Sequence, residues 1–219
     1  EVIGMHAASR EALERLNETL DQGLRESDNT VEIGATTGTE LFDVVDVLDS
    51  DRSLRVALVD AAAEPEQRVA LIKGLLAGKV SASTEEIVSA AVTQTWSDTR
   101  DFRNGLIALG RRALLRSAEA QGQLDRVEDE LYQLARIVER EPQLERLLAD
   151  KAVSSDARRD LLAKVLYGKV TAVTEALATQ TVGRLRESPA EAFESLSALA
   201  AELKDKAVAH VRSSGAQPA

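Results

Sequence analysis

A chain of 219 residues with a net charge of −10 lacks the basic surface that nucleic acid or an anionic membrane would require. The absence of cysteine excludes disulfides, thiolate catalysis and zinc–thiolate sites. Aromatic residues make up only 3%, so any core must be aliphatic, and the Ala-, Leu-, Glu- and Arg-rich composition favours helices. No apolar run approaches the roughly 18 residues of a membrane span, so we expect no direct membrane insertion.

The first third of the chain predicts short amphipathic helices. Residues 9–24 place leucine and alanine three and four positions apart, with Ser9 as a plausible cap. Residues 29–38 have two glycines, several threonines and no helical period, so we expect a loop there. Further helices are predicted over residues 39–49, 52–59, 65–76 and 84–94.

Start and stop signals bound two of these helices. Pro65 suits the first position of a helix, and Gly78 can adopt the left-handed conformation that ends one. The run Ser83-Thr84-Glu85-Glu86 has the pattern of a capping box. Helical character breaks at Trp96-Ser97-Asp98 and then resumes. Gly122 interrupts it, so one long, kinked rod over residues 99–138 is one interpretation.

An internal repeat organises the chain. Residues 40–92 match residues 130–182 at a constant offset of 90 positions without a gap. Roughly a third of the positions are identical, and most others keep apolar against apolar. The paired motifs include Glu40-Leu41-Phe42 with Glu130-Leu131-Tyr132, and Gly78-Lys79-Val80 with Gly168-Lys169-Val170. We infer a duplicated helical domain.

The repeat predicts an all-α fold of two tandem bundles, each with five or six helices. Arg10-Glu11-Ala12-Leu13 resembles Arg111-Arg112-Ala113-Leu114, so the second copy shares its first helix with the end of the first. We place the first bundle at residues 5–110, the second at 111–204 and a C-terminal segment at 205–219. Weak alternation over residues 207–211 leaves open the start of a β-strand.

No motif predicts catalysis, a cofactor or a metal. Gly74 to Val80 has one residue too few between its glycines for a phosphate loop and lies at a helix C-terminus, which disfavours anions. His6 and His210 are single histidines near opposite ends of the chain, and Asp46, Asp49 and Asp51 lack calcium-loop spacing. Trp96, the only tryptophan, lies at a helix break and is expected to pack in a core, with partner contact as the alternative.

The sequence resembles δ subunits of bacterial F-type ATP synthases in their actinobacterial form. Four segments carry the resemblance: the opening from Met5 to Leu13, Gly78-Lys79-Val80, Trp96 to Asp101, and Val127 to Val138. In that lineage the region resembles a tandem expansion of the six-helix N-terminal domain and is sometimes fused to a b subunit.

The resemblance implies a non-catalytic stator subunit at the cytoplasmic face of the cell membrane. Such a subunit clamps the catalytic head to the b-type stalk subunit and receives the N-terminal helices of α subunits in a groove. The groove of the family lies between the first and fifth helices, which here correspond to residues 9–24 and 84–94. Its candidate residues are Leu13, Leu16, Ile87, Val88 and Ala91, with core packing as the alternative for each.

This sequence departs from the family pattern at its end. The C-terminal domain of the family, which binds the b subunit, would begin near Ala207, and the chain ends at Ala219. The second hypothesis for function is a generic helical adaptor unrelated to ATP synthase. Binding of a peptide from the N-terminus of an α subunit would discriminate between the two.

Overall fold

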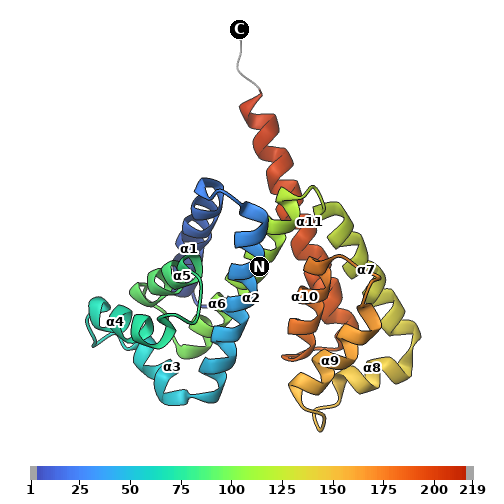
Figure 1. Cartoon of the computed structure of the whole chain (residues 1–219), viewed down its shortest axis with the longest axis horizontal. Coiled ribbons are helices and arrows are strands. Elements are labelled where there is room, and N and C mark those ends of the chain that lie inside the picture. Colours follow the sequence, from blue (N-terminus) through green and yellow to red (C-terminus); the bar gives the residue numbers. More distant parts are fainter. Residues whose placement is uncertain (1–3, 216–219) are drawn as a thin grey trace. The chain divides into compact units, whose positions relative to one another are not determined.

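The fold consists of helices that gather into two separate units (Figure 1). A computed structural model describes residues 4–215, and every regular element in that range is a helix. Contacts divide the chain into unit 1, Glu1–Ala120, and unit 2, Gln121–Ala219. The all-α prediction is therefore confirmed for the described residues.

Unit 1 is a six-helix bundle. Its helices are α1 (Ala7–Glu26), α2 (Thr30–Ser50), α3 (Arg52–Val59), α4 (Pro65–Leu76), α5 (Ala82–Thr93) and α6 (Thr99–Ala120). Helix α1 packs against α5 and α6, and α2 runs alongside α6. The buried core is almost entirely aliphatic, as a chain with few aromatic residues requires.

Unit 2 has five helices in its described part. They are α7 (Leu124–Arg140), α8 (Pro142–Ala149), α9 (Ser155–Leu166), α10 (Ala172–Val182) and α11 (Pro189–Ser214). At the offset of 90 residues they correspond in order to α2 through α6. Within the described residues of unit 2, no helix corresponds to α1.

One carboxylate in each unit caps a helix from across the bundle. Glu40 on α2 accepts hydrogen bonds from the backbone N of Ser81 (3.0 Å), the Ser81 hydroxyl (2.7 Å) and the Thr84 hydroxyl (2.8 Å). These groups lie at the N-terminus of α5, where backbone N–H groups lack helical partners. The N-cap is therefore Ser81, not the predicted Ser83.

Unit 2 repeats this cap. Glu130 on α7 accepts from the backbone N of Thr171 (3.1 Å), the Thr171 hydroxyl (2.8 Å) and the Thr174 hydroxyl (2.8 Å). These residues stand at the same offset from Glu40, Ser81 and Thr84, and they begin α10. The internal repeat pairs Glu40 with Glu130, and in the structure both glutamates cap the N-terminus of the corresponding helix.

A buried arginine in each unit fastens the ends of helices. Arg68 is 7% exposed and donates to the carbonyl oxygens of Val92 (2.7 Å), Asp60 (2.9 Å) and Ala63 (2.6 Å). Val92 and Asp60 lie at the C-terminal ends of α5 and α3, the negative poles of these helices, which attract a cation, and Ala63 lies in the turn between α3 and α4. Arg158 of unit 2 is 8% exposed and donates to Val182 O (3.1 Å).

The predicted loop at residues 29–38 is wrong, because α2 begins at Thr30 with Asn29 as its N-cap. Its glycines serve close packing. A Cβ on Gly38 would lie 2.7 Å from Leu114 Cγ and 2.8 Å from the carbonyl oxygen of Gly110 on α6. The tight helix contact offsets the cost of about 1 kcal/mol for glycine in a helix, a trade-off that local sequence cannot reveal.

The predicted rod over residues 99–138 is also wrong. Helix α6 ends at Ala120 and α7 begins at Leu124, and Gly122 between them has φ +69°. The division between units follows Ala120, later than the boundary expected at residue 110. Residues 111–120 continue α6 along α2, where the Ser117 hydroxyl donates to Val31 O at 2.6 Å.

The start of a β-strand, which the sequence left open over residues 207–211, is not found, because α11 continues to Ser214. Ala207 and Val211 stand four positions apart, which also suits a helix, and alanine favours that conformation. The last residues of the predicted C-terminal segment, 216–219, and the side chain of His210 lie outside the described structure.

Candidate partner-binding face and a histidine–aspartate cluster

The five residues predicted to line a groove meet in the core of unit 1. Leu13 and Leu16 on α1 are 8% and 1% exposed, and Ile87, Val88 and Ala91 on α5 are between 0% and 3% exposed. All five belong to one buried cluster. The contact between α1 and α5 that the family resemblance implied is therefore present, but the five residues lie on the inward side of both helices. Contact of these five residues with a partner stays a prediction.

A different set of residues covers the outer side of this pair of helices. Arg15 Nε on α1 donates to Gln94 Oε1, immediately after α5, at 3.0 Å. Helical periodicity puts Ala8 and Glu11 in line with Arg15, and Glu86 and Ala90 in line with Gln94. Each of these side chains is exposed or partly exposed. We call these six residues the α1/α5 face.

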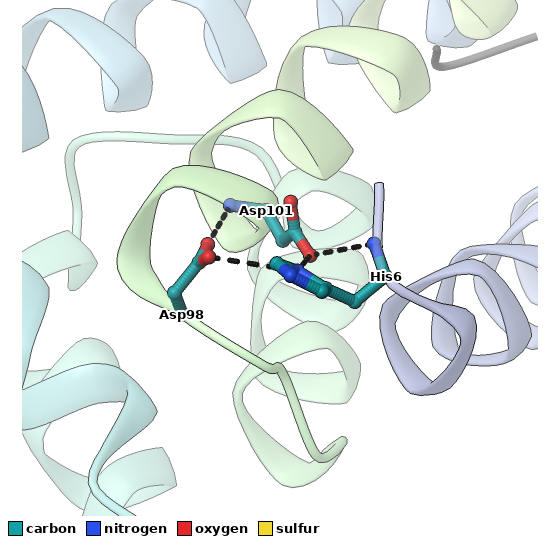
Figure 2. Close-up of side chains that lie close together, drawn as sticks. All are labelled: His6, Asp98 and Asp101. Atoms are coloured by element: carbon teal, nitrogen blue, oxygen red, sulfur yellow. Dashed lines mark hydrogen bonds and ion pairs between the residues drawn. The ribbon is translucent and has the colours of Figure 1, made fainter. Parts of the chain in front are cut away.

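A second feature joins the N-terminal segment to the start of α6. Figure 2 shows the ring of His6 beside two aspartates. His6 Nδ1 lies 3.0 Å from Asp101 Oδ2 and 3.6 Å from Asp98 Oδ2, and the backbone N of His6 donates to the same Asp101 oxygen at 3.1 Å. The Asp101 side chain is only 4% exposed, whereas that of His6 is 64% exposed.

Hydrogen bonds within the protein already engage both aspartates of this cluster. Asp98 Oδ1 caps α6 by accepting from the backbone N of Asp101 at 2.7 Å. Burial alone would raise the pKa of Asp101, but hydrogen bonds from Ser9 and His6 outweigh it and hold that pKa below its usual value. Nearby, the backbone N of Ser97 donates to Ser9 Oγ at 3.0 Å. The cluster therefore fastens the start of α1 to the start of α6.

The ligand atoms of His6, Asp98 and Asp101 lie within 4.8 Å of one another, a spacing that could suit a metal ion. Two observations favour the structural role instead. The carboxylates are engaged in the bonds described above, and they stand at the positive end of α6, which attracts anions rather than cations. The sequence contains the cap between Asp98 and Asp101, but it gives no sign of His6, which is 95 residues away.

Trp96 belongs to the core of unit 1, as predicted. It is 6% exposed, its Nε1 donates to Ala91 O at 2.8 Å, and its ring meets Phe102 edge-on with centroids 5.6 Å apart. A Cβ on Gly105 would lie 2.6 Å from the ring, so α6 leaves a slot for the indole. The predicted helix stop is also confirmed, since Gly78 has φ +71° beyond the end of α4.

The described helices include none that is both long enough and apolar enough to cross a membrane.

The comparisons with known proteins all indicate the same family. The family described as ATP synthase delta (OSCP) subunit matches residues 112–216. The chain is 71% identical over 211 residues to the ATP synthase subunit delta of Corynebacterium urealyticum, covering 96% of this chain and 78% of that protein. It is 68% identical to the subunit of the same name from Corynebacterium jeikeium, covering 97% and 78%. For Corynebacterium efficiens the identity is 59%, covering 94% and 75%.

Proposed function

Because this chain belongs to the family of ATP synthase δ subunits, we propose that it is a non-catalytic subunit of the peripheral stalk that binds the N-terminal helix of an α subunit at the α1/α5 face. Because the chain belongs to this family, we set aside the alternative hypothesis of a helical adaptor unrelated to ATP synthase. The proposal also includes attachment to a b-type stalk subunit at the cytoplasmic side of the membrane, which holds the catalytic head against rotation.

The adjacency of α1 and α5 is the observation that carries this proposal. Two neighbouring helices offer a long surface to a third helix, and the small side chains of Ala8 and Ala90 leave space for larger apolar groups of the partner. Beneath them Leu13, Leu16, Ile87, Val88 and Ala91 keep the two helices in register. In this account those five residues act through the rigidity of the face.

Unit 1 is the better candidate for this contact because it contains α1. Among the described residues of unit 2, α10 corresponds to α5, but no helix of that unit corresponds to α1. A third helix would therefore meet a complete pair only in unit 1.

Calorimetric titration of the full chain with a peptide from the N-terminus of the α subunit tests the proposal. Ala90→Arg puts a bulky charge on the face and should weaken binding at least about tenfold. Gln180→Arg adds the same side chain at the corresponding position of unit 2 and should leave binding unchanged. Absence of saturable binding, or equal weakening by both variants, would contradict the proposal. Circular dichroism checks that both variants remain folded.

A further inference from the structure

The surface of unit 2 has a pocket between α7 and α11 that the proposed function does not use. Its volume is about 400 Å³. Asp125, Glu128, Asp129 and Tyr132 line it from α7, and Ser197 and Lys204 line it from α11.

Comparison with unit 1 explains why this pocket exists. At the offset of 90 residues, Tyr132 corresponds to Phe42, which is 2% exposed and packs on α6. A Cβ on Gly110 would come within 3.2 Å of the Phe42 ring, so the ring packs closely on the backbone of α6 at this glycine. Unit 2 has Ala200 at the position of Gly110, and Tyr132 is 46% exposed. A buried helix contact in one unit is an open, polar recess in the other.

The charges in the pocket are unbalanced. Lys204 Nζ lies 2.8 Å from Glu128 Oε2 and 3.1 Å from Asp125 Oδ1, so one ammonium group serves two carboxylates. Asp129 is exposed and forms no ion pair within the described residues. Three carboxylates against one ammonium leave the lining acidic.

The aromatic wall of the pocket already accepts a guanidinium group. The Arg136 guanidinium carbon lies 5.0 Å from the centroid of the Tyr132 ring, within cation–π range. Arg136 is itself paired with Glu139 (3.0 Å) and with Glu194, so it is held beside the ring rather than in the pocket. Tyr132 is thus an aromatic ring of the acidic lining that is already in cation–π contact with one guanidinium group.

We propose that this pocket receives an arginine side chain from a helix of a partner protein. A guanidinium group can pair with Asp129 through two parallel hydrogen bonds and stack on an aromatic ring, which an ammonium group does less well. Anionic ligands are disfavoured by the carboxylates, and an apolar side chain would leave them desolvated without compensation. The site is in unit 2 and is independent of the α1/α5 face.

The test uses the full chain and a defined probe, a short alanine-based helical peptide with two arginines four positions apart. Binding is followed by the amide NMR signals of the chain. Asp129→Asn should weaken binding about three- to fivefold, the effect of losing one exposed ion pair. Lys204→Gln should strengthen it by a similar factor, because it removes a competing cation. These opposite signs would not arise from a general loss of structure.

Two controls complete the experiment. Glu145→Gln removes a partly exposed carboxylate from α8, outside the pocket, and should leave the affinity unchanged. The same peptide with glutamine in place of arginine should not bind. The proposal is overturned if the arginine peptide moves no signals of α7 and α11, if Lys204→Gln fails to strengthen binding, or if Glu145→Gln weakens binding as much as Asp129→Asn does. None of the pocket variants should affect the α-subunit peptide at unit 1, so the two proposals can fail separately.

Discussion

The two units share one set of helices but present different surfaces. The cap by Glu40 recurs at Glu130, and the buried Arg68 recurs as Arg158. The features that differ lie elsewhere: α1 is found only in unit 1 of the described chain, and the buried Phe42 is replaced by the exposed Tyr132. Contacts that end and cap helices therefore recur in both units, while the surfaces of the two units differ.

The largest effect is expected from a charge in the core of unit 1. Val88 is fully buried, so Val88→Asp should cost more than about 4 kcal/mol and unfold this unit. Trp96 is the only tryptophan and lies in unit 1, so its fluorescence reports that unit alone. The matched variant Ala178→Asp in α10 should instead leave the Trp96 signal native. Loss of the native Trp96 signal in Ala178→Asp would show that the units do not fold separately.

Replacement of the buried arginines should affect the two units unequally. Arg68→Met leaves three carbonyl oxygens without their donor and should cost about 3–4 kcal/mol. Arg158→Met removes one bond to a carbonyl and one to the Ser155 hydroxyl, so about 1–2 kcal/mol is expected. Hydrogen exchange of amides in each unit measures both values. An equal loss of unfolding free energy in the two variants would contradict the view that the number of hydrogen bonds to carbonyl oxygens determines how much each arginine stabilises its unit.

Removal of the shared caps should affect the two units alike. Glu40→Gln and Glu130→Gln each replace an acceptor oxygen with a donor that faces other donors, at a cost of about 1–2 kcal/mol. Exchange should accelerate first at the start of α5 or of α10, respectively. A marked difference between the two variants would mean that the caps are not equivalent.

The smallest effect concerns acid stability and applies to unit 1. Burial would raise the pKa of Asp21, but hydrogen bonds and charges from Arg112 and Arg116 outweigh it and lower that pKa. A lowered carboxyl pKa contributes stability above its ordinary value of 3.8, and that stability is lost as the pH falls toward the lowered value. Trp96 fluorescence should therefore show an acid transition that is reduced in Asp21→Asn. An unchanged transition would assign acid sensitivity to other groups.

Local signals predicted much of the fold. Pro65 opens a helix, and Gly78 follows the end of one, because these residues act through their own backbone. The errors arose where distant contacts decide the structure. Gly34 and Gly38 suggested a loop, yet close packing against α6 keeps them helical.

The candidate site shows the same division between local and distant information. The family resemblance implied that α1 and α5 would lie together, and the helical spacing of apolar residues on them selected Leu13, Leu16, Ile87, Val88 and Ala91. That spacing could not say which side of the pair is exposed, because periodicity finds the apolar stripe and that stripe is the core. The link from Arg15 to Gln94 and the cluster around His6 join residues far apart in the chain and left no signal in the sequence.

The most direct test of the account is an NMR titration of the isotopically labelled full chain with the N-terminal peptide of the α subunit. The account predicts saturable shifts in unit 1, centred on Arg15, Ala90 and Gln94, with the signals of α10 unmoved. Shifts confined to α10 around Gln180, or no shifts at all, would contradict it.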